Sequence, residues 1–181
     1  MADARVSARR RRSRARRAPD RRAADRSRRL RGARLIRTGR QAMQQAIQHV
    51  GVDTRGRGLV EFTARVRAFV DQQTIRTGLL TVFCRHTSAS LLIQENADPS
   101  VQRDLERYFE TLAPEHATRY EHDTEGADDM PAHLRTALTQ VQLSIPVENG
   151  RMVLGTWQGI YLFEHRRAAH RRDVVLHLIG E

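Results

Sequence analysis

Apolar side chains follow two different periods along this chain, and each period predicts a class of element. Between residues 59 and 73 they recur every three or four positions, which indicates a helix. The same spacing returns after Pro99, with Asp98 in the N-cap position, and a shorter helix is expected to begin at Pro131. Three helices are therefore expected, over at least 62–72, 99–112 and 131–140.

Shorter runs that are continuously apolar or alternate with polar residues are typical of strands. They number about seven and cover residues 46–52, 78–86, 88–96, 141–147, 151–157, 159–166 and 173–181. Helices interrupt the first half of the chain and strands dominate the second, which is not a regular βαβ repeat. The expected fold class is therefore α+β, a single-domain sandwich, and the chain has no Gly-rich phosphate loop of the Rossmann or Walker type.

Charge divides the chain into two parts. All 32 basic residues are Arg, and the formal net charge is +11. Residues 1–40 carry 17 Arg against three acids, whereas residues 41–181 carry 15 Arg against 18 acids. The basic character therefore belongs to the first segment, and a mildly acidic domain over residues 43–181 follows it.

The segment of residues 1–42 has almost no large apolar side chains before Leu30, so we expect it to be disordered. Three interpretations remain open for it. It is an arm that binds nucleic acid or another acidic surface, an Arg-rich targeting peptide, or sequence upstream of a natural start at Met43. Any contact with nucleic acid is expected through this segment alone.

The single cysteine, Cys84, lies in the apolar run LLTVFCRH and is expected to be buried in a strand. One cysteine excludes a disulfide framework, which favours a cytoplasmic location. No apolar stretch approaches 18 residues, so no membrane contact is expected.

The stretch EHDTEGADDMPAH over residues 121–133 holds five carboxylates and two histidines. Like charges repel one another unless water, a metal ion or a cationic ligand offsets them. Asp128 and Asp129 precede a predicted helix and have helix capping as an alternative role. Glu125 has no such role, so it is the stronger functional candidate among these acids.

Three of the eight histidines stand out. His86 follows a predicted buried strand, and His122 and His133 bracket the acidic stretch. A strand end and a loop can bring three imidazoles together, and zinc is commonly bound by histidine nitrogens. The spacing matches no established ligand signature, so three unrelated surface histidines are the alternative.

Four segments together resemble the YjbQ family: HTSASLLIQENADPSV (86–101), YEHDTEGADDMPAH (120–133), LGTWQGIYLFEHR (154–166) and the final GE. The resemblance spans roughly residues 44–181. It implies a compact α+β sandwich that assembles into a homotrimer. It also implies thiamine-phosphate synthase activity, which joins hydroxymethylpyrimidine diphosphate to thiazole phosphate and releases pyrophosphate.

The motifs and the residue chemistry together give a set of candidate site residues. The expected catalytic residues are His86, His122, Glu125 and Asp129; the expected substrate-binding residues are Asn96, Asp98, Arg135 and Trp157; the expected metal ligands are His86, His122 and His133. Asp98 also has its capping role and Trp157 has a core role as alternatives. A divalent metal, Mg²⁺ or Zn²⁺, is the expected cofactor.

Other functions remain open at this stage. The chain is alternatively a metal-dependent hydrolase or another small-molecule enzyme with thiamine-phosphate formation as a side activity. A trimeric ligand-binding module and a nucleic-acid-binding protein are further alternatives. The second of these predicts binding that weakens steeply with salt and depends on residues 1–42.

Overall fold

The computed structural model describes residues 42–116 and 118–181. The predictions for residues 1–42 lie outside this part of the chain, apart from Ala42. The strands are β1 (Gln44–Asp53), β2 (Gly58–Glu61), β3 (Gly78–Cys84), β4 (Ala89–Glu95), β5 (Gln142–Glu148), β6 (Arg151–Met152), β7 (Gln158–Glu164) and β8 (Arg171–Gly180). The helices are α2 (Thr63–Asp71), α3 (Pro99–Leu112) and α4 (Asp129–Leu138).

The strands form two antiparallel sheets. The larger sheet has the order β1-β8-β3-β5-β6, and the smaller has the order β2-β7-β4. Strand β8, the last element of the chain, pairs with β1 on one side and β3 on the other. Strands far apart in the sequence therefore build the larger sheet.

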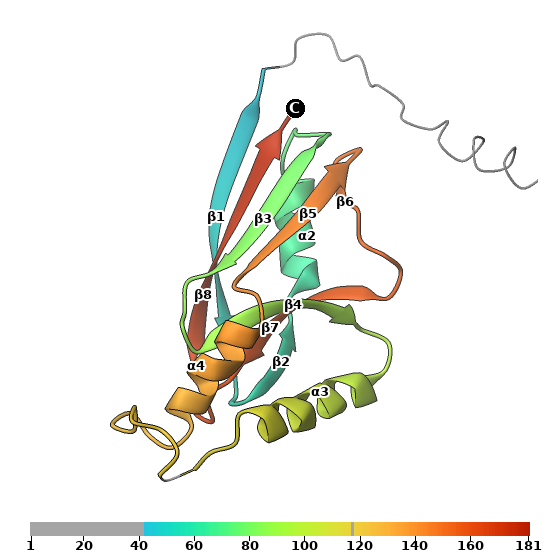
Figure 1. Ribbon diagram of the computed structural model, residues 1–181. Coiled ribbons are helices and arrows are strands. Elements are labelled where there is room, and N and C mark those ends of the chain that lie inside the picture. The colour runs from blue at the N-terminus through green and yellow to red at the C-terminus, as the bar shows by residue number, and fades with distance from the viewer. Residues whose placement is uncertain (1–41, 117) are drawn as a thin grey trace, which may run out of the picture. The chain divides into compact units, whose positions relative to one another are not determined.

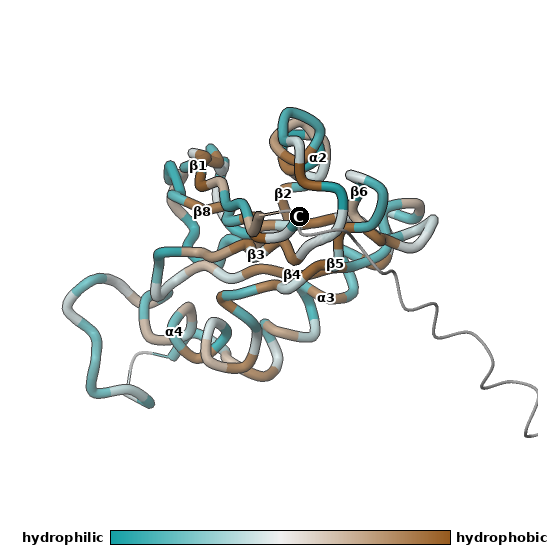
Figure 2. The backbone as a smooth tube through the Cα atoms, turned by 90° about the horizontal axis from the view of Figure 1, so that it is seen from above, coloured by the Kyte–Doolittle hydropathy of each residue, from teal (hydrophilic) through white to brown (hydrophobic). Residues whose placement is uncertain are grey.

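The main core lies between the larger sheet and α2 and continues to the smaller sheet through Leu91, Ile160 and Leu162. Alternate residues of β5 are buried, and α2 buries Val66, Phe69 and Val70 against the same cluster. Figures 1 and 2 show α2 on one side of the larger sheet and α4 on the other. The burial of one stripe of α2 matches its helical spacing of apolar residues.

The smaller sheet has a second layer of its own. Its central strand, β7, is buried along nearly all its length. Phe109 of α3 contacts Phe163 of β7 edge to face, with 5.4 Å between the ring centroids. Asp98 is the N-cap of helix α3, and its carboxylate accepts a hydrogen bond from the Ser100 N–H at 2.8 Å. The predicted capping role of Asp98 is therefore present.

The face of the larger sheet opposite α2 keeps apolar side chains at the surface. Ile47, Leu79, Phe83 and Ile179 are exposed there, on three neighbouring strands. Paired positions include Leu79 with Ile179. Exposed apolar side chains gathered on one face of a sheet often mark a protein interface. The homotrimer implied by the family resemblance stays a prediction.

The α+β fold class is confirmed, with two differences in the elements. Strand β2 is an eighth strand, because residues 58–61 pair with the end of β7. The strand expected over 151–157 is reduced to Arg151 and Met152. Cys84 is buried in β3 as expected. Among the described residues, no helix is long and apolar enough to cross a membrane.

Candidate metal centre

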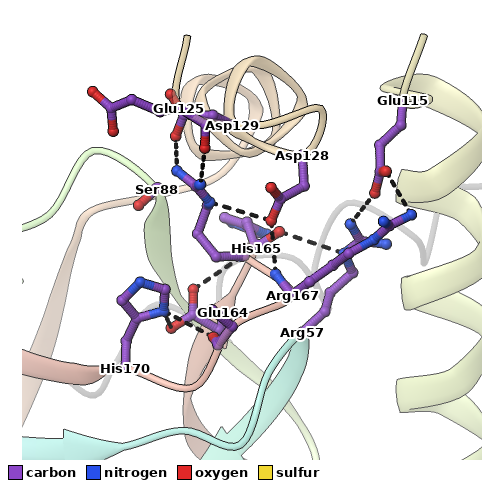
Figure 3. Close-up of polar contacts among 12 residues, drawn as sticks. Arg57, Ser88, Glu115, Glu125, Asp128, Asp129, Glu164, His165, Arg167 and His170 are labelled. Atoms are coloured by element: carbon purple, nitrogen blue, oxygen red, sulfur yellow. Dashed lines mark hydrogen bonds and ion pairs between the residues drawn. The ribbon is translucent and has the colours of Figure 1, made fainter. Parts of the chain in front are cut away.

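Three segments distant in the sequence meet at the N-terminal end of α4. They are the acidic loop that precedes the helix, the connection between β3 and β4, and the residues directly after β7. Figure 3 shows Asp128 and Asp129 turned toward the end of β7, whereas the carboxylate of Glu125 points away from it. The fold therefore gathers acids, histidines and arginines at one point.

Asp129 is the centre of this arrangement. It is the first residue of α4, and only 2% of it is exposed. Its Oδ2 lies 2.8 Å from His122 Nε2 and 3.4 Å from His133 Nε2. The three ligand atoms lie within 4.8 Å of one another. We call these residues the His122–Asp129–His133 cluster.

The second ring nitrogen of His133 is fixed by the backbone. His133 Nδ1 lies 2.9 Å from the carbonyl oxygen of Thr87, and a carbonyl only accepts hydrogen bonds. Nδ1 therefore carries a proton that it donates to Thr87, and Nε2 is the ring nitrogen that faces Asp129. Such a hydrogen bond is the usual second contact of a metal-ligating histidine.

Arg166 holds the other side of the Asp129 carboxylate. Its NH1 pairs with Asp129 Oδ1, its Nε donates to Asp128 Oδ2 at 3.2 Å, and its NH2 donates to the Glu125 carbonyl at 2.7 Å. The Arg167 N–H donates to the same Asp128 oxygen at 2.8 Å. The segment after β7 therefore fixes the loop 125–129 and leaves Asp129 Oδ2 to the histidines.

A buried ion pair between Glu164 and Arg172 stabilises the segment after β7. Glu164 is fully buried and accepts hydrogen bonds from Arg172 at 2.7 and 2.6 Å and from Thr54 Oγ1 at 3.0 Å. Burial alone would raise the pKa of Glu164, but the bonds from Arg172 and from the Arg166 N–H lower it below its usual value. Glu164 is therefore charged, and its buried ion pair with Arg172 fixes the end of β7 next to the site.

His165 follows Glu164 in the chain and is also fully buried. Its Nε2 is 2.9 Å from Ser90 Oγ, and its ring contacts Phe163 at a centroid distance of 4.4 Å. Burial, followed by the nearby positive charge of Arg135, lowers the pKa of His165 from 6.5 to about 3. It is therefore neutral and structural at ordinary pH.

A hollow of about 780 Å³ lies beside the cluster. We call it the α4 hollow; its lining includes Phe83, His86, Thr87, His133, Ala137 and Val141. His133 thus belongs both to this hollow and to the cluster. His86 Nε2 accepts a hydrogen bond from the Asp173 N–H at 2.7 Å, and burial lowers the pKa of His86. His86 does not join the cluster; Asp129 takes the third position instead.

The remaining predicted residues lie apart from the cluster. Glu125 is exposed, and only its backbone carbonyl contacts Arg166. Arg135 is buried and donates to the Ala113 carbonyl at 2.9 Å. Asn96 lines a separate groove of about 780 Å³ beside α2. Trp157 is 64% exposed, which excludes its core role, and its carbonyl accepts from the Asn96 N–H.

Three positioning groups were not assigned their roles from the sequence. Arg166, Glu164 and Arg172 are not among the site residues that the sequence predicts. One signal for them was present. Glu164 and His165 end an otherwise apolar strand, and buried ionisable residues in such a position need partners.

The chain belongs to the family described as UPF0047 protein YjbQ-like, which it matches over residues 48–181. A UPF0047 protein of Synechocystis is 54% identical over 130 residues, covering 72% of this chain and 88% of the relative. The UPF0047 protein YugU of Bacillus subtilis is 38% identical over 106 residues, covering 59% of this chain and 78% of YugU.

Solved structures agree with this assignment. A conserved hypothetical protein of Thermus thermophilus aligns with a TM-score of 0.63 and 37% identity, over 71% of this chain and 97% of that protein. A YbjQ-like protein of unknown function from Sulfolobus solfataricus aligns with a TM-score of 0.71 at 23% identity, over 77% of this chain and all of that protein. At that identity the second match supports the fold alone.

The prediction of thiamine-phosphate synthase activity is wrong as an inference from the family. The relatives are described only as UPF0047 proteins, and a structural relative is described as having unknown function. Family membership therefore carries the fold to this chain but carries no reaction, and function has to be argued from the site.

Proposed function

We propose that this chain is a metal-dependent small-molecule enzyme whose His122–Asp129–His133 cluster binds one divalent cation. The observation that carries the proposal is the convergence of two imidazole nitrogens on one carboxylate oxygen, with all three ligand atoms within 4.8 Å of one another. Two histidines and one carboxylate make up the protein ligands of a common class of catalytic zinc site.

The surroundings of the three ligands support the proposal. The Thr87 carbonyl fixes the His133 tautomer that leaves Nε2 free to bind a metal. Arg166 occupies Asp129 Oδ1, so Oδ2 is the oxygen presented to a cation. Unlike the buried Asp129, both histidines are partly exposed, with 45% and 31% of their side chains accessible, so a cation has a route of entry.

The donor set favours a borderline-soft cation such as Zn²⁺ over Mg²⁺, because two of the three ligands are imidazoles. A zinc ion held by these three residues would retain a position for water and would lower the pKa of that water toward neutrality. Asp129 and the two histidines would bind the charged cation, and Arg166 would keep the Asp129 carboxylate in place. Hydrolysis of a small molecule is the chemistry that this arrangement suits best.

The test is calorimetric titration of the metal-free full chain with Zn²⁺. We expect one equivalent to bind, and His122→Ala to weaken binding at least about tenfold while the chain keeps its circular dichroism spectrum. His177→Ala is the matched control, because His177 lies on β8, where its Nε2 is 3.3 Å from Gln45 Oε1, and it is not part of the cluster. Absent binding, or equal loss in both variants, contradicts the proposal.

A further inference from the structure

The α4 hollow lies against the metal centre and differs from it in character. Phe83, Ala137 and Val141 contribute apolar surface to its lining, and His133 is shared with the His122–Asp129–His133 cluster. A molecule in the hollow therefore lies next to the proposed cation. Ligand sites in proteins typically combine such apolar walls with a few polar groups that fix orientation.

Charge around the hollow is unlike that of the rest of the domain. The domain is mildly acidic, yet the described residues that line the hollow include no carboxylate and one arginine, Arg85. Arg85 NH1 pairs with Asp173 at 2.7 Å, so its charge is partly balanced. A neutral or anionic head group is therefore favoured over a cationic one, the more so beside a divalent metal.

His86 adds a hydrogen-bond donor to the hollow. Its Nε2 accepts from the Asp173 N–H, so in the neutral ring the proton is on Nδ1. An N–H donor in the lining of the hollow suits an oxygen-rich head group. The Thr87 carbonyl, by contrast, is already engaged with His133 and offers less to a ligand.

We infer that the α4 hollow binds the apolar ring or branched chain of a small oxyanion, a carboxylate or a phosphonate-like group, whose head reaches the metal held by the cluster. This inference rests on the proposed function and names its ligand class. The apolar body lies against Phe83, Ala137 and Val141, and the head group lies between His86 and the cation.

The test uses the zinc-loaded full chain and two pairs of probes, benzoate with acetate and phenylphosphonate with methylphosphonate. Calorimetry is expected to show the phenyl member binding at least about tenfold more tightly than the methyl member in one pair or both. The pair that shows the larger preference identifies the head group. Repeating the titrations after Co²⁺ replaces Zn²⁺ is expected to shift the visible absorption of the metal, because the head contacts it.

Two variants localise the effect. Ala137→Phe fills the hollow from an exposed position on α4 and is expected to abolish the phenyl preference without changing Zn²⁺ affinity. Leu138→Phe is the control, since Leu138 is the next residue, is 64% exposed and does not line the hollow. The control is expected to keep the preference.

The outcomes separate this inference from the proposed function. Three outcomes would contradict the ligand site in the hollow while leaving the metal centre supported. In each of them the chain binds zinc. The phenyl and methyl probes then bind with equal affinity, no probe binds, or the phenyl preference persists in Ala137→Phe. A change in oligomeric mass caused by Ala137→Phe would also overturn the ligand site, since the hollow would then be an interface between copies. Failure to bind zinc overturns both.

Discussion

Arg166→Gln is the substitution that probes the candidate site most directly. The Arg166 side chain is 16% exposed and faces two carboxylates, Asp129 at 2% and Asp128 at 13% exposure. Removing one partner of a buried ion pair costs about 3–5 kcal/mol, because a charge stays buried without compensation. The Arg167 N–H still bonds Asp128, so we expect the lower end, about 3 kcal/mol.

The loss is measured by urea and thermal unfolding of the full chain in the presence of EDTA. A change of about 3 kcal/mol corresponds to a fall of about 10 °C in the midpoint for a domain of this size. Arg167→Gln is the control, because the Arg167 side chain is 68% exposed and its partner Glu115 keeps a second ion pair with Arg57. That change is expected to cost less than about 1 kcal/mol.

Zinc gives the same experiment a second readout. At a free concentration about 100 times its Kd, zinc stabilises the wild-type chain by about 2.7 kcal/mol. Loss of a positioning contact typically weakens metal affinity about 10- to 100-fold, which leaves about 0.4–1.4 kcal/mol at the same concentration. Equal unfolding midpoints for Arg166→Gln and Arg167→Gln, or equal stabilisation of both variants by zinc, would refute a positioning role for Arg166.

Two further predictions concern stability and assembly. The pKa of His165 falls from 6.5 to about 3 on folding, so the unfolded chain binds more protons than the folded chain between these pH values. The free energy of unfolding should therefore fall by up to about 1.4 kcal/mol per pH unit as the pH drops through this range. His165→Asn should flatten that slope in urea titrations between about pH 7 and 4, and parallel curves for the two proteins would contradict it. Sedimentation equilibrium should give about three times the 20.8 kDa chain mass, and Ile47→Glu with Leu79→Glu on the exposed sheet face should reduce it. A wild-type chain that sediments as a monomer would exclude the trimer.

Most helices and strands could be predicted because the periodic pattern of apolar residues extends over many positions in each of them. Strand β2 was not predicted, because its four residues continue directly into the helical spacing of α2. Its pairing with β7 decides its conformation. Residues 153–157 look like strand by composition, yet they leave the sheet after Met152. Short elements depend on partners that a local pattern does not contain.

For the candidate site, residue types were predictable but their grouping was not. His122 and His133 were predicted to be metal ligands, and the structure brings their side chains together. Asp129 rather than Glu125 is the buried acid, because α4 begins at Asp129 and Arg166 holds its carboxylate there. That contact joins residues 37 positions apart, and no local spacing encodes it.

The position of β8 inside the larger sheet also has a consequence for synthesis. Among the described residues β1 pairs with β8 alone, and about 120 residues separate the two strands. At typical elongation rates the ribosome needs roughly 6–24 s to produce that interval. During this time β1 is an unpaired edge that includes Ile47, a template for pairing with other chains. Slower translation or higher temperature should therefore increase aggregation of the nascent protein more than of the finished one.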